Sequence, residues 1–390
     1  MCVQAATTIR AADIPLSLYL HWPWCVRKCP YCDFNSHAAP PELAEKEYVD
    51  IVLKDLAGWL PAVEGRRIET VFIGGGTPSL MSGDAVARLL DGADKLFGFS
   101  PDCEITLEAN PGTVEEGRFK AFRSAGVNRV SVGVQSFMNE KLRRLGRIHA
   151  ADDALRAAAH AGEVFGNFNL DLMFALPGET LEEAAREVET AVATGATHLS
   201  FYQLTIEPGT AFAKRLPEGL PDEDLCADMS DLVIGALLKA GFEHYEVSGY
   251  ARPGHRCRHN LNYWTFGDYV AAGAGAHGKV TTSEGVVREV RHASPRKYMA
   301  KVAETGNGIA ERRRVESGDL PFEFMLNALR LTDGVPAALF EARTGLSLEV
   351  VSHALGSLRA QGLLEEDEAL IRPTARGRAF LSDLQEAFLH

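Results

Sequence analysis

Short apolar runs alternate with amphipathic stretches through the first two thirds of the chain. The β-branched and aromatic runs predict strands, and the 3.6-residue periodicity between them predicts helices. We expect strands at 16–21, 69–73, 103–108, 129–134, 167–174 and 198–204. We expect helices at about 41–59, 82–97, 113–125, 151–164, 180–194 and 222–240. Regular alternation of this kind is typical of an α/β fold in which crossover helices join parallel strands.

Polar segments with Gly or Pro follow several of these strands directly, namely GGGTP, EANPG, ALPGET and TIEPGT. In parallel α/β folds the carboxyl ends of the strands carry the site, so we expect these segments to gather on one face. Six strand–helix units predict a partial (β/α)6 barrel over residues 16–240 rather than a closed eight. Residues 1–15 are then an N-terminal tail.

The pattern changes after residue 240. Residues 241–318 are expected to form a connecting segment of loops and short strands, because the stretch from Glu246 to Arg291 is rich in Gly, His and Arg. From residue 319 to 390 the chain predicts three helices (about 320–331, 335–344 and 347–361), a short hairpin and a final helix from Thr374. This order is the outline of a winged-helix-like module.

Composition and charge narrow the class of protein. With 46% hydrophobic and 24% charged residues among 390, the chain is typical of a globular protein, not of a disordered or collagen-like one. No apolar run is long enough to span a membrane, and Met1 to Pro15 does not resemble a signal peptide, so we expect a cytoplasmic location. The net charge of -13 argues against a nucleic-acid partner.

Three of the seven cysteines, Cys25, Cys29 and Cys32, lie within eight residues with the spacing C-x3-C-x2-C. Three thiolates on one loop can bind three irons of a [4Fe-4S] cluster and leave the fourth iron open. A structural zinc site prefers four ligands, usually in two separated pairs, so zinc fits this spacing poorly. Incidental cysteines remain the simpler alternative, although three in one loop argue against it.

The C-x3-C-x2-C motif after the first strand of a βα barrel resembles the radical S-adenosylmethionine (SAM) superfamily. In that superfamily the open iron chelates the amino and carboxylate groups of SAM, and one electron from the reduced cluster cleaves SAM to a 5′-deoxyadenosyl radical. The run Gly74-Gly75-Gly76-Thr77-Pro78 resembles the motif that binds the SAM amino group. A tight turn explains one glycine there but not three.

Further positions resemble one branch of the superfamily, which comprises oxygen-independent coproporphyrinogen III oxidases and HemW-type haem chaperones. The resemblance implies that residues at the strand ends and in the cysteine loop bind SAM. These residues are Tyr19, Tyr31, Gly75, Gly76, Thr77, Glu108, Gln135, Arg147 and Asp171. Taken singly, helix capping or surface charge would explain the charged ones.

Two departures separate the chain from the oxidases. Phe34 occupies the position, two residues after Cys32, where the oxidases carry a fourth cysteine, and only 24 residues precede Cys25 where the oxidases have a longer arm. The run from His259 to Trp264, HNLNYW, matches the H-N-x-x-Y-W motif of the chaperones. The resemblance therefore favours the chaperones.

Haem is the ligand that this motif implies. His259 is the candidate axial ligand, because imidazole nitrogen binds haem iron and aromatic rings pack against the macrocycle. Cys257 is an alternative thiolate ligand, and Arg252, Arg256 and Arg258 are candidates to pair with propionates. A buried histidine beside two core aromatic residues is the structural alternative.

Three functions remain open from the sequence. The favoured one is a haem chaperone that binds a [4Fe-4S] cluster, SAM and haem, receives electrons from a donor and passes haem to acceptor proteins, in solution or at the membrane. The second is coproporphyrinogen III oxidase, which decarboxylates two propionates oxidatively. The third, a winged-helix regulator with a redox cluster, is disfavoured by the charge of -4 from Leu320 onward (6 Arg against 10 Asp and Glu).

Overall fold

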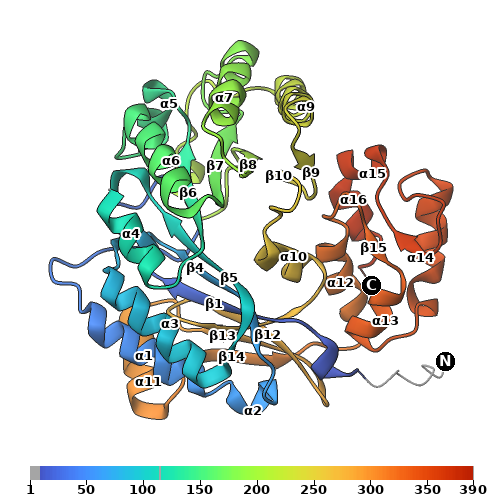
Figure 1. Cartoon of the computed structure of the whole chain (residues 1–390). Helices are drawn as coiled ribbons and strands as arrows, with labels where there is room; N and C mark the ends of the chain where they lie inside the picture. Colours follow the sequence, from blue (N-terminus) through green and yellow to red (C-terminus); the bar gives the residue numbers. More distant parts are fainter. Residues whose placement is uncertain (1–8, 114–115, 390) are drawn as a thin grey trace.

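A computed structural model describes residues 9–113 and 116–389, so residues 1–8 of the expected N-terminal tail, with the cysteine Cys2, lie outside the described residues. Its main sheet has 12 strands in the order β14-β13-β12-β11-β1-β4-β5-β6-β7-β8-β10-β9. The six central strands are all parallel and correspond to the predicted ones (Figure 1). They are β1 (Leu16–Trp22), β4 (Ile68–Gly75), β5 (Phe99–Ala109), β6 (Arg129–Gln135), β7 (Phe168–Phe174) and β8 (His198–Gln203). The expected partial barrel is confirmed.

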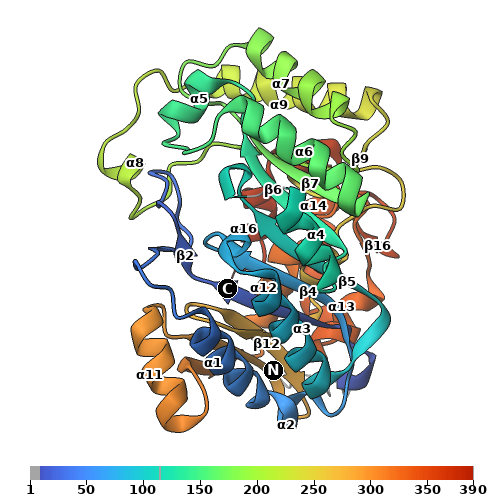
Figure 2. The same ribbon diagram turned by 60° about the vertical axis from the view of Figure 1, so that its left-hand side comes forward.

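Six long helices follow these strands and cover the outer face of the sheet (Figure 2). They are α1 (Glu45–Ala57), α3 (Gly83–Phe97), α4 (Glu116–Ser124), α6 (Ala151–Phe165), α7 (Leu181–Ala193) and α9 (Glu223–Lys239). Shorter pieces are β2 (Trp24–Cys25), β3 (His37–Ala38), α2 (Leu60–Val63), α5 (Asn139–Arg144) and α8 (Ala211–Lys214). A capping box fixes the start of α7, where Thr180 and Glu183 bond each other's backbone N–H.

The central strands turn opposite faces to two different environments. Alternate residues such as Leu18, Val71 and Val132 are fully buried against the helices and form the main core. The residues between them face the barrel interior and are largely polar, and the strand register aligns Tyr19 with Phe72 and Glu108 with Ser131. The sheet therefore places its apolar side chains in the core and its chemistry-bearing side chains inside the barrel.

The structure differs from the sequence expectation over residues 241–318, which are mostly regular structure rather than a loop-rich connector. β11 (Asp268–Ala272) pairs in parallel with β1, and antiparallel strands extend the sheet beyond it. The remaining elements of this segment are β9 (Glu243–His244), β10 (Gly249–Ala251), α10 (Arg258–Trp264), β12 (His277–Thr282), β13 (Gly285–Arg291), α11 (Pro295–Thr305) and β14 (Ile309–Arg314). This segment widens the barrel wall.

The C-terminal module is built around a second core, which also includes Phe266 and Val286 of the preceding segment, and it lies beside α10, away from α4 and α6 (Figure 1). It contains α12 (Leu320–Ala328), β15 (Val335–Pro336), α13 (Ala338–Thr344), α14 (Glu349–Ala360), β16 (Leu370–Ile371), α15 (Ala375–Ala379) and α16 (Leu381–Glu386). β15 pairs with β16, which completes the winged-helix-like outline. None of the helices in the described parts of the chain is long and apolar enough to cross a lipid bilayer.

Candidate functional site

A cavity of about 240 Å³ lies at the carboxyl ends of the central strands. It brings together every predicted site residue except Tyr19 and His259. Those that line it are Cys25, Cys29, Tyr31, Cys32, Gly75, Gly76, Thr77, Glu108, Gln135, Arg147 and Asp171. Residues from five strands and the cysteine loop thus share one space.

The three thiols of the cysteine loop line the same cavity. Cys25 ends β2, and the backbone N–H of Cys32 donates to Cys29 O at 3.2 Å, which folds the loop. In the described residues no three His, Cys, Asp or Glu side chains converge tightly enough to bind one metal ion. Three thiols on one loop match a cluster in which each thiolate binds a different iron.

Positive charge lies beside these thiols. Arg147 donates from Nη1 to Cys29 Sγ at 3.6 Å and from Nη2 to Gly133 O at 2.7 Å, while its Nε is buried without a partner. Burial raises the pKa of Cys25 and of Cys32, so these thiols are neutral at neutral pH until a metal displaces their protons. Arg147 therefore places a buried guanidinium in direct contact with the cysteine loop.

Two buried carboxyl groups face the cavity. Glu108 Oε2 accepts a hydrogen bond from Gly75 N at 3.0 Å, and burial, followed by the charge of Asp171, raises the pKa of Glu108 to about 8. Asp171 accepts hydrogen bonds from Ser131 Oγ and from Asn169 Nδ2, each at 2.8 Å, and burial raises its pKa. Both are acceptors for the hydroxyl and ammonium groups of a polar ligand.

Gln135 has a left-handed backbone at the end of β6, with φ of 69°. Such a conformation is uncommon for a residue other than Gly and is typical of functional sites. Tyr202 donates from its hydroxyl to Gln135 Oε1 at 2.6 Å and lines the cavity. Tyr202 is not among the site residues expected from the sequence, although Tyr202 continues the inward-facing row of His198 and Ser200 on β8.

The glycine run ends β4 in close contact with other parts of the chain. A Cβ at Gly75, where φ is 114°, would lie 2.4 Å from Cε1 of His21, and one at Gly76 would lie 2.6 Å from Trp24 O. From the sequence, these glycines are expected to allow close approach of a ligand. The structure adds a packing reason, because the turn must pass between His21 and the backbone of Trp24.

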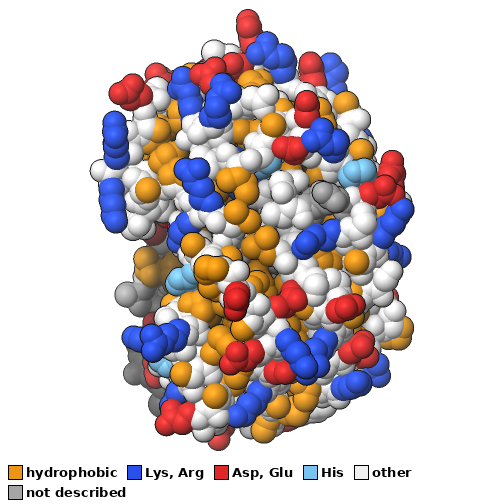
Figure 3. All heavy atoms as spheres, turned by 90° about the vertical axis from the view of Figure 1, so that its left-hand side faces the viewer, with side chains coloured by type: hydrophobic (Ala, Val, Ile, Leu, Met, Phe, Trp, Pro, Cys, Tyr) orange, Lys and Arg blue, Asp and Glu red, His pale blue; other side chains and the backbone are white. Residues whose placement is uncertain are grey.

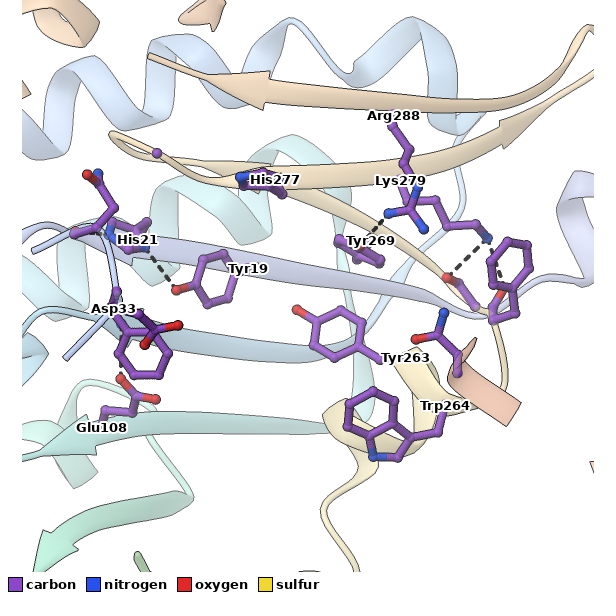
Figure 4. Close-up of a pocket in the computed structure, with 17 residues that line it drawn as sticks. Tyr19, His21, Asp33, Glu108, Tyr263, Trp264, Tyr269, His277, Lys279 and Arg288 are labelled. Carbon is purple, nitrogen blue, oxygen red and sulfur yellow. Dashed lines mark hydrogen bonds between the residues drawn. The ribbon is translucent and has the colours of Figure 1, made fainter. Parts of the chain in front are cut away.

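A second, larger cavity of about 580 Å³ adjoins the first (Figure 4). The two cavities share Phe34, Gly75 and Glu108. The wall of the larger cavity combines aromatic side chains with as many charged and amide ones, and the size of the cavity is usual for a site that binds an organic ligand. Its lining includes Tyr19, His21, Asp33, Tyr263, Trp264, Phe266, Tyr269, His277, Lys279, Arg288 and Asn327.

The two cations of the larger cavity are held differently. Lys279 is fully buried and donates to Phe266 O at 2.8 Å, Gly267 O at 3.3 Å and Asp268 Oδ1 at 3.0 Å, so all its protons are used. Arg288 pairs with Glu323 of the C-terminal module at 2.7 Å and donates to Tyr269 OH at 3.1 Å. Arg288 therefore joins the barrel to the C-terminal module through an ion pair at the cavity wall.

His259 lies behind the larger cavity, on α10. Its Nδ1 shares a hydrogen bond with Thr70 Oγ1 at 2.7 Å, its Nε2 shares one with Tyr263 OH at 2.8 Å, and the residue is 1% exposed. Tyr263 and Trp264 of the same motif do line the cavity. In this conformation the motif presents its aromatic rings to the cavity and keeps its imidazole in the wall.

The other residues near the motif that were expected to bind haem also have partners within the protein or are buried. Arg256 pairs with Glu243 at 3.0 Å and with Asp333 at 2.7 Å, and Arg258 pairs with Asp102 at 3.2 Å. The thiol of Cys257 is fully buried, and burial raises its pKa to about 12. These side chains join α10 and the strands around it to their neighbours rather than line either cavity.

Arg252 is likewise packed, with its guanidinium 4.1 Å above the ring of Phe242 and hydrogen-bonded to Ala240 O. Charged side chains of both signs are interspersed over the outer face formed by the helices of the barrel, around a central group of apolar side chains (Figure 3).

Comparison with known proteins places the chain in a family. Residues 19–191 match the radical SAM superfamily, and residues 316–380 match the HemN C-terminal domain. The curated protein "Heme chaperone HemW" of Escherichia coli is 49% identical over 96% of this chain and 98% of its own length. "Heme chaperone HemW" of Bacillus subtilis is 33% identical over 96% of this chain and 99% of its own length.

A mitochondrial relative and a solved structure extend the comparison. "Radical S-adenosyl methionine domain-containing protein 1, mitochondrial" of Mus musculus is 37% identical over 97% of this chain and 90% of its own length. The structure of coproporphyrinogen III oxidase (HemN) from Escherichia coli superposes with a TM-score of 0.82 at 22% identity, over 100% of this chain and 95% of that one. By sequence and fold, the chain belongs to the HemW family of the radical SAM superfamily.

Proposed function

We propose that this chain is a haem chaperone that carries a [4Fe-4S] cluster and SAM beside its haem site and delivers haem to acceptor proteins. The observation that carries the proposal is the pair of adjoining cavities. One is small, polar and lined by three thiols, and the other is larger and walled by aromatic side chains. The names of the relatives, which describe haem chaperones, agree with this division.

Cys25, Cys29 and Cys32 hold the cluster in this proposal, and an external protein supplies its electrons. When bound, a cluster with one open iron offers a coordination position for the amino and carboxylate groups of SAM. Glu108 and Asp171 accept hydrogen bonds from the ligand, and Gln135 is held by Tyr202 at the carboxyl end of β6. Tyr31 and Arg147 close the cavity beside the cysteine loop.

The larger cavity holds haem as cargo. Tyr263, Trp264 and Tyr269 present flat apolar surface to a macrocycle, which aromatic rings contact with large buried area. Arg288 supplies a positive charge for a propionate at the edge of the cavity. Asn327 of the C-terminal module completes the wall, so cargo leaves along the boundary between module and barrel to reach acceptors in solution or at a membrane surface.

A pair of neighbouring substitutions tests the location. Asn327→Trp places an indole in the larger cavity, whereas Leu326→Trp adds the same group at an adjacent exposed position outside it. We expect haem titration of the anaerobically reconstituted full chain to reach one equivalent in wild type and in the Leu326 variant. Asn327→Trp should lower haem occupancy and keep the cluster absorbance, because the thiols line the other cavity.

The competing function is that of a coproporphyrinogen III oxidase, because the fold is similar to that of HemN. The same preparation, supplied with SAM, a reductant and coproporphyrinogen III, separates the two. We expect haem binding without appearance of protoporphyrinogen. Protoporphyrinogen formation over several turnovers would overturn the chaperone proposal, and so would the absence of saturable haem binding by the wild-type chain.

A further inference from the structure

The histidine side chains near the larger cavity differ in whether their ring nitrogens are hydrogen-bonded to other residues. His21 lines the cavity, but its Nδ1 and Nε2 are hydrogen-bonded to Tyr19 OH and Asn35 O, each at 2.9 Å. His259 is similarly occupied by Thr70 and Tyr263. His277 is the exception: its side chain makes no hydrogen bond within the described part of the chain, and it is exposed to the cavity that it lines.

We infer that His277 supplies the axial nitrogen to the iron of haem bound in the larger cavity. The inference rests on the proposed haem site and adds to it the ligand of the metal. It moves the coordinating role from the HNLNYW motif to the first residue of β12. Imidazole is a common axial ligand of haem iron, and it must be neutral with a free lone pair to bind.

The strand register places His277 at an open point of the cavity. Tyr269 on β11 pairs with Lys279, and continuing this antiparallel register by two residues puts His277 across from Ala271. Ala271 in turn pairs with Tyr19 on β1. The short side chain of Ala271 is fully buried between these two neighbours, and the rings of Tyr19 and His277 both line the cavity (Figure 4). The register therefore places the two rings on the same face of the sheet, on either side of Ala271.

The surroundings of His277 suit the ligand chemically. Burial and the nearby Arg288 lower the pKa of His277, which keeps the imidazole neutral at neutral pH. Arg288 on β13 pairs with Lys279 on β12, which in turn pairs with Tyr269 on β11. Lys279 is two residues after His277 on β12. A haem ligated by His277 therefore has a positive charge within reach of its carboxylate edge, and Tyr263 and Trp264 stand on the wall that α10 provides.

His259 has a different role in this arrangement. Through Nε2 it fixes the hydroxyl of Tyr263, and the ring of Tyr263 lies edge-on to that of Tyr269, with centroids 4.6 Å apart. It is a positioning residue that orders the aromatic wall. Its replacement should therefore loosen haem binding without changing the atom that binds iron.

The test compares three single substitutions in the full, cluster-loaded chain: His277→Ala, His259→Ala and, as a control on the exposed face of α14, His353→Ala. Ferrous haem complexes are examined by resonance Raman spectroscopy for the iron–histidine stretching band. We expect His277→Ala to lose that band and to bind haem roughly tenfold more weakly or worse, because a direct ligand is removed. Added imidazole should restore a nitrogen-ligated spectrum in this variant.

The His259 and His353 variants make it possible to test the axial ligand separately from the proposed haem-chaperone function. We expect the band at an unchanged frequency in the His259 and His353 variants, with affinity reduced in the former only. Retention of the band in His277→Ala, together with its loss in His259→Ala, would overturn the inference while leaving a haem chaperone. A wild-type chain that shows no saturable haem binding would instead overturn the proposed function.

Discussion

Glu108 and Gly75 meet at the wall between the two cavities, where Oε2 of the carboxyl group accepts a hydrogen bond of 3.0 Å from the glycine N–H. The bond joins the end of β5 to the end of β4. It also places a carboxyl group whose pKa is raised to about 8 where a ligand in either cavity can reach it. Proton uptake at Glu108 is therefore linked both to folding and to ligand binding.

The first prediction concerns the pH dependence of stability. The pKa of Glu108 rises from 4.5 to about 8 on folding, so the folded chain holds a proton that the unfolded chain releases. This contribution is complete below pH 4.5 and is lost as the pH rises through about 8. Glu108→Gln has no such proton, so its melting temperature relative to wild type should increase between about pH 5 and pH 8.

Thermal unfolding of the cluster-free chain followed by circular dichroism across that range measures the effect. The control is Glu69→Gln, which removes an exposed carboxyl group on the neighbouring strand β4, and its curve should run parallel to wild type. A Glu108→Gln curve parallel to wild type would contradict a raised pKa.

The second prediction concerns the cluster. Anaerobic reconstitution should give about four irons and four sulfides per chain, as a single [4Fe-4S] site requires. Cys25→Ala, Cys29→Ala and Cys32→Ala should each abolish the visible absorbance of the cluster. Cys103→Ala and Cys226→Ala are controls that should retain it, since neither residue lines the smaller cavity. A normal cluster in the Cys32 variant would mean that the ligands are misassigned.

The third prediction concerns Tyr202. Tyr202→Phe removes the donor to Gln135 Oε1 and leaves a buried acceptor unpaired. We expect SAM affinity, measured by calorimetry on the cluster-loaded chain, to fall by about 1 kcal/mol, or roughly fivefold. Tyr250 is a buried tyrosine on β10 that lines neither cavity, so Tyr250→Phe should leave SAM affinity unchanged. Equal affinities in both variants would remove Tyr202 from the site.

The fourth prediction concerns the glycine run. Gly75→Ala adds a Cβ 2.4 Å from His21 at a φ of 114°, so it should destabilise the whole fold by at least ~1–3 kcal/mol in urea unfolding. The same substitution at Gly235, in α9 with nothing within 4 Å of the added atom, should instead stabilise by ~0.5–1 kcal/mol. If Gly75→Ala weakened SAM binding without loss of stability, ligand approach alone would explain the glycine.

The fifth prediction concerns Arg256. Its ion pairs with Glu243 and Asp333 are partly exposed, so Arg256→Ala should cost under about 1 kcal/mol of stability and leave haem affinity within roughly twofold. Arg288→Ala removes a cation that does line the larger cavity and should weaken haem more. Haem titrations of the two variants side by side measure the difference, and a larger loss in Arg256→Ala would place the propionates near α10.

Much of the fold could be predicted because local patterns determine it. Apolar runs and helical periodicity predict the six central strands and their helices. The polar segments that directly follow these strands predict the smaller cavity. β11 could not be predicted in the same way, since its partner β1 lies about 250 residues away and no local pattern reports such a pairing. β5 is also longer than expected, because Phe99 pairs with Ile68 across a register shift beyond the apolar run.

The larger cavity was missed for a related reason. Its wall combines β1, α10, β12, β13 and α12, and the roles of its histidines depend on neighbours that the sequence does not place together. His259 stands in a recognisable motif, yet Thr70 of β4 occupies one of its nitrogens. His277 has no motif, and only the strand register brings it opposite Ala271 and Tyr19.

The alternation of side chains along the central strands has a consequence for how this scaffold can change. On β1, Leu18 and Leu20 pack against helices, whereas Tyr19 and His21 between them face the cavity. The core-facing positions are therefore constrained by folding, whereas the cavity-facing positions between them are constrained by ligand binding. A mutant library confined to the cavity-facing set could sample new ligand specificities while leaving the hydrophobic core intact, which makes the barrel a favourable starting point for directed evolution.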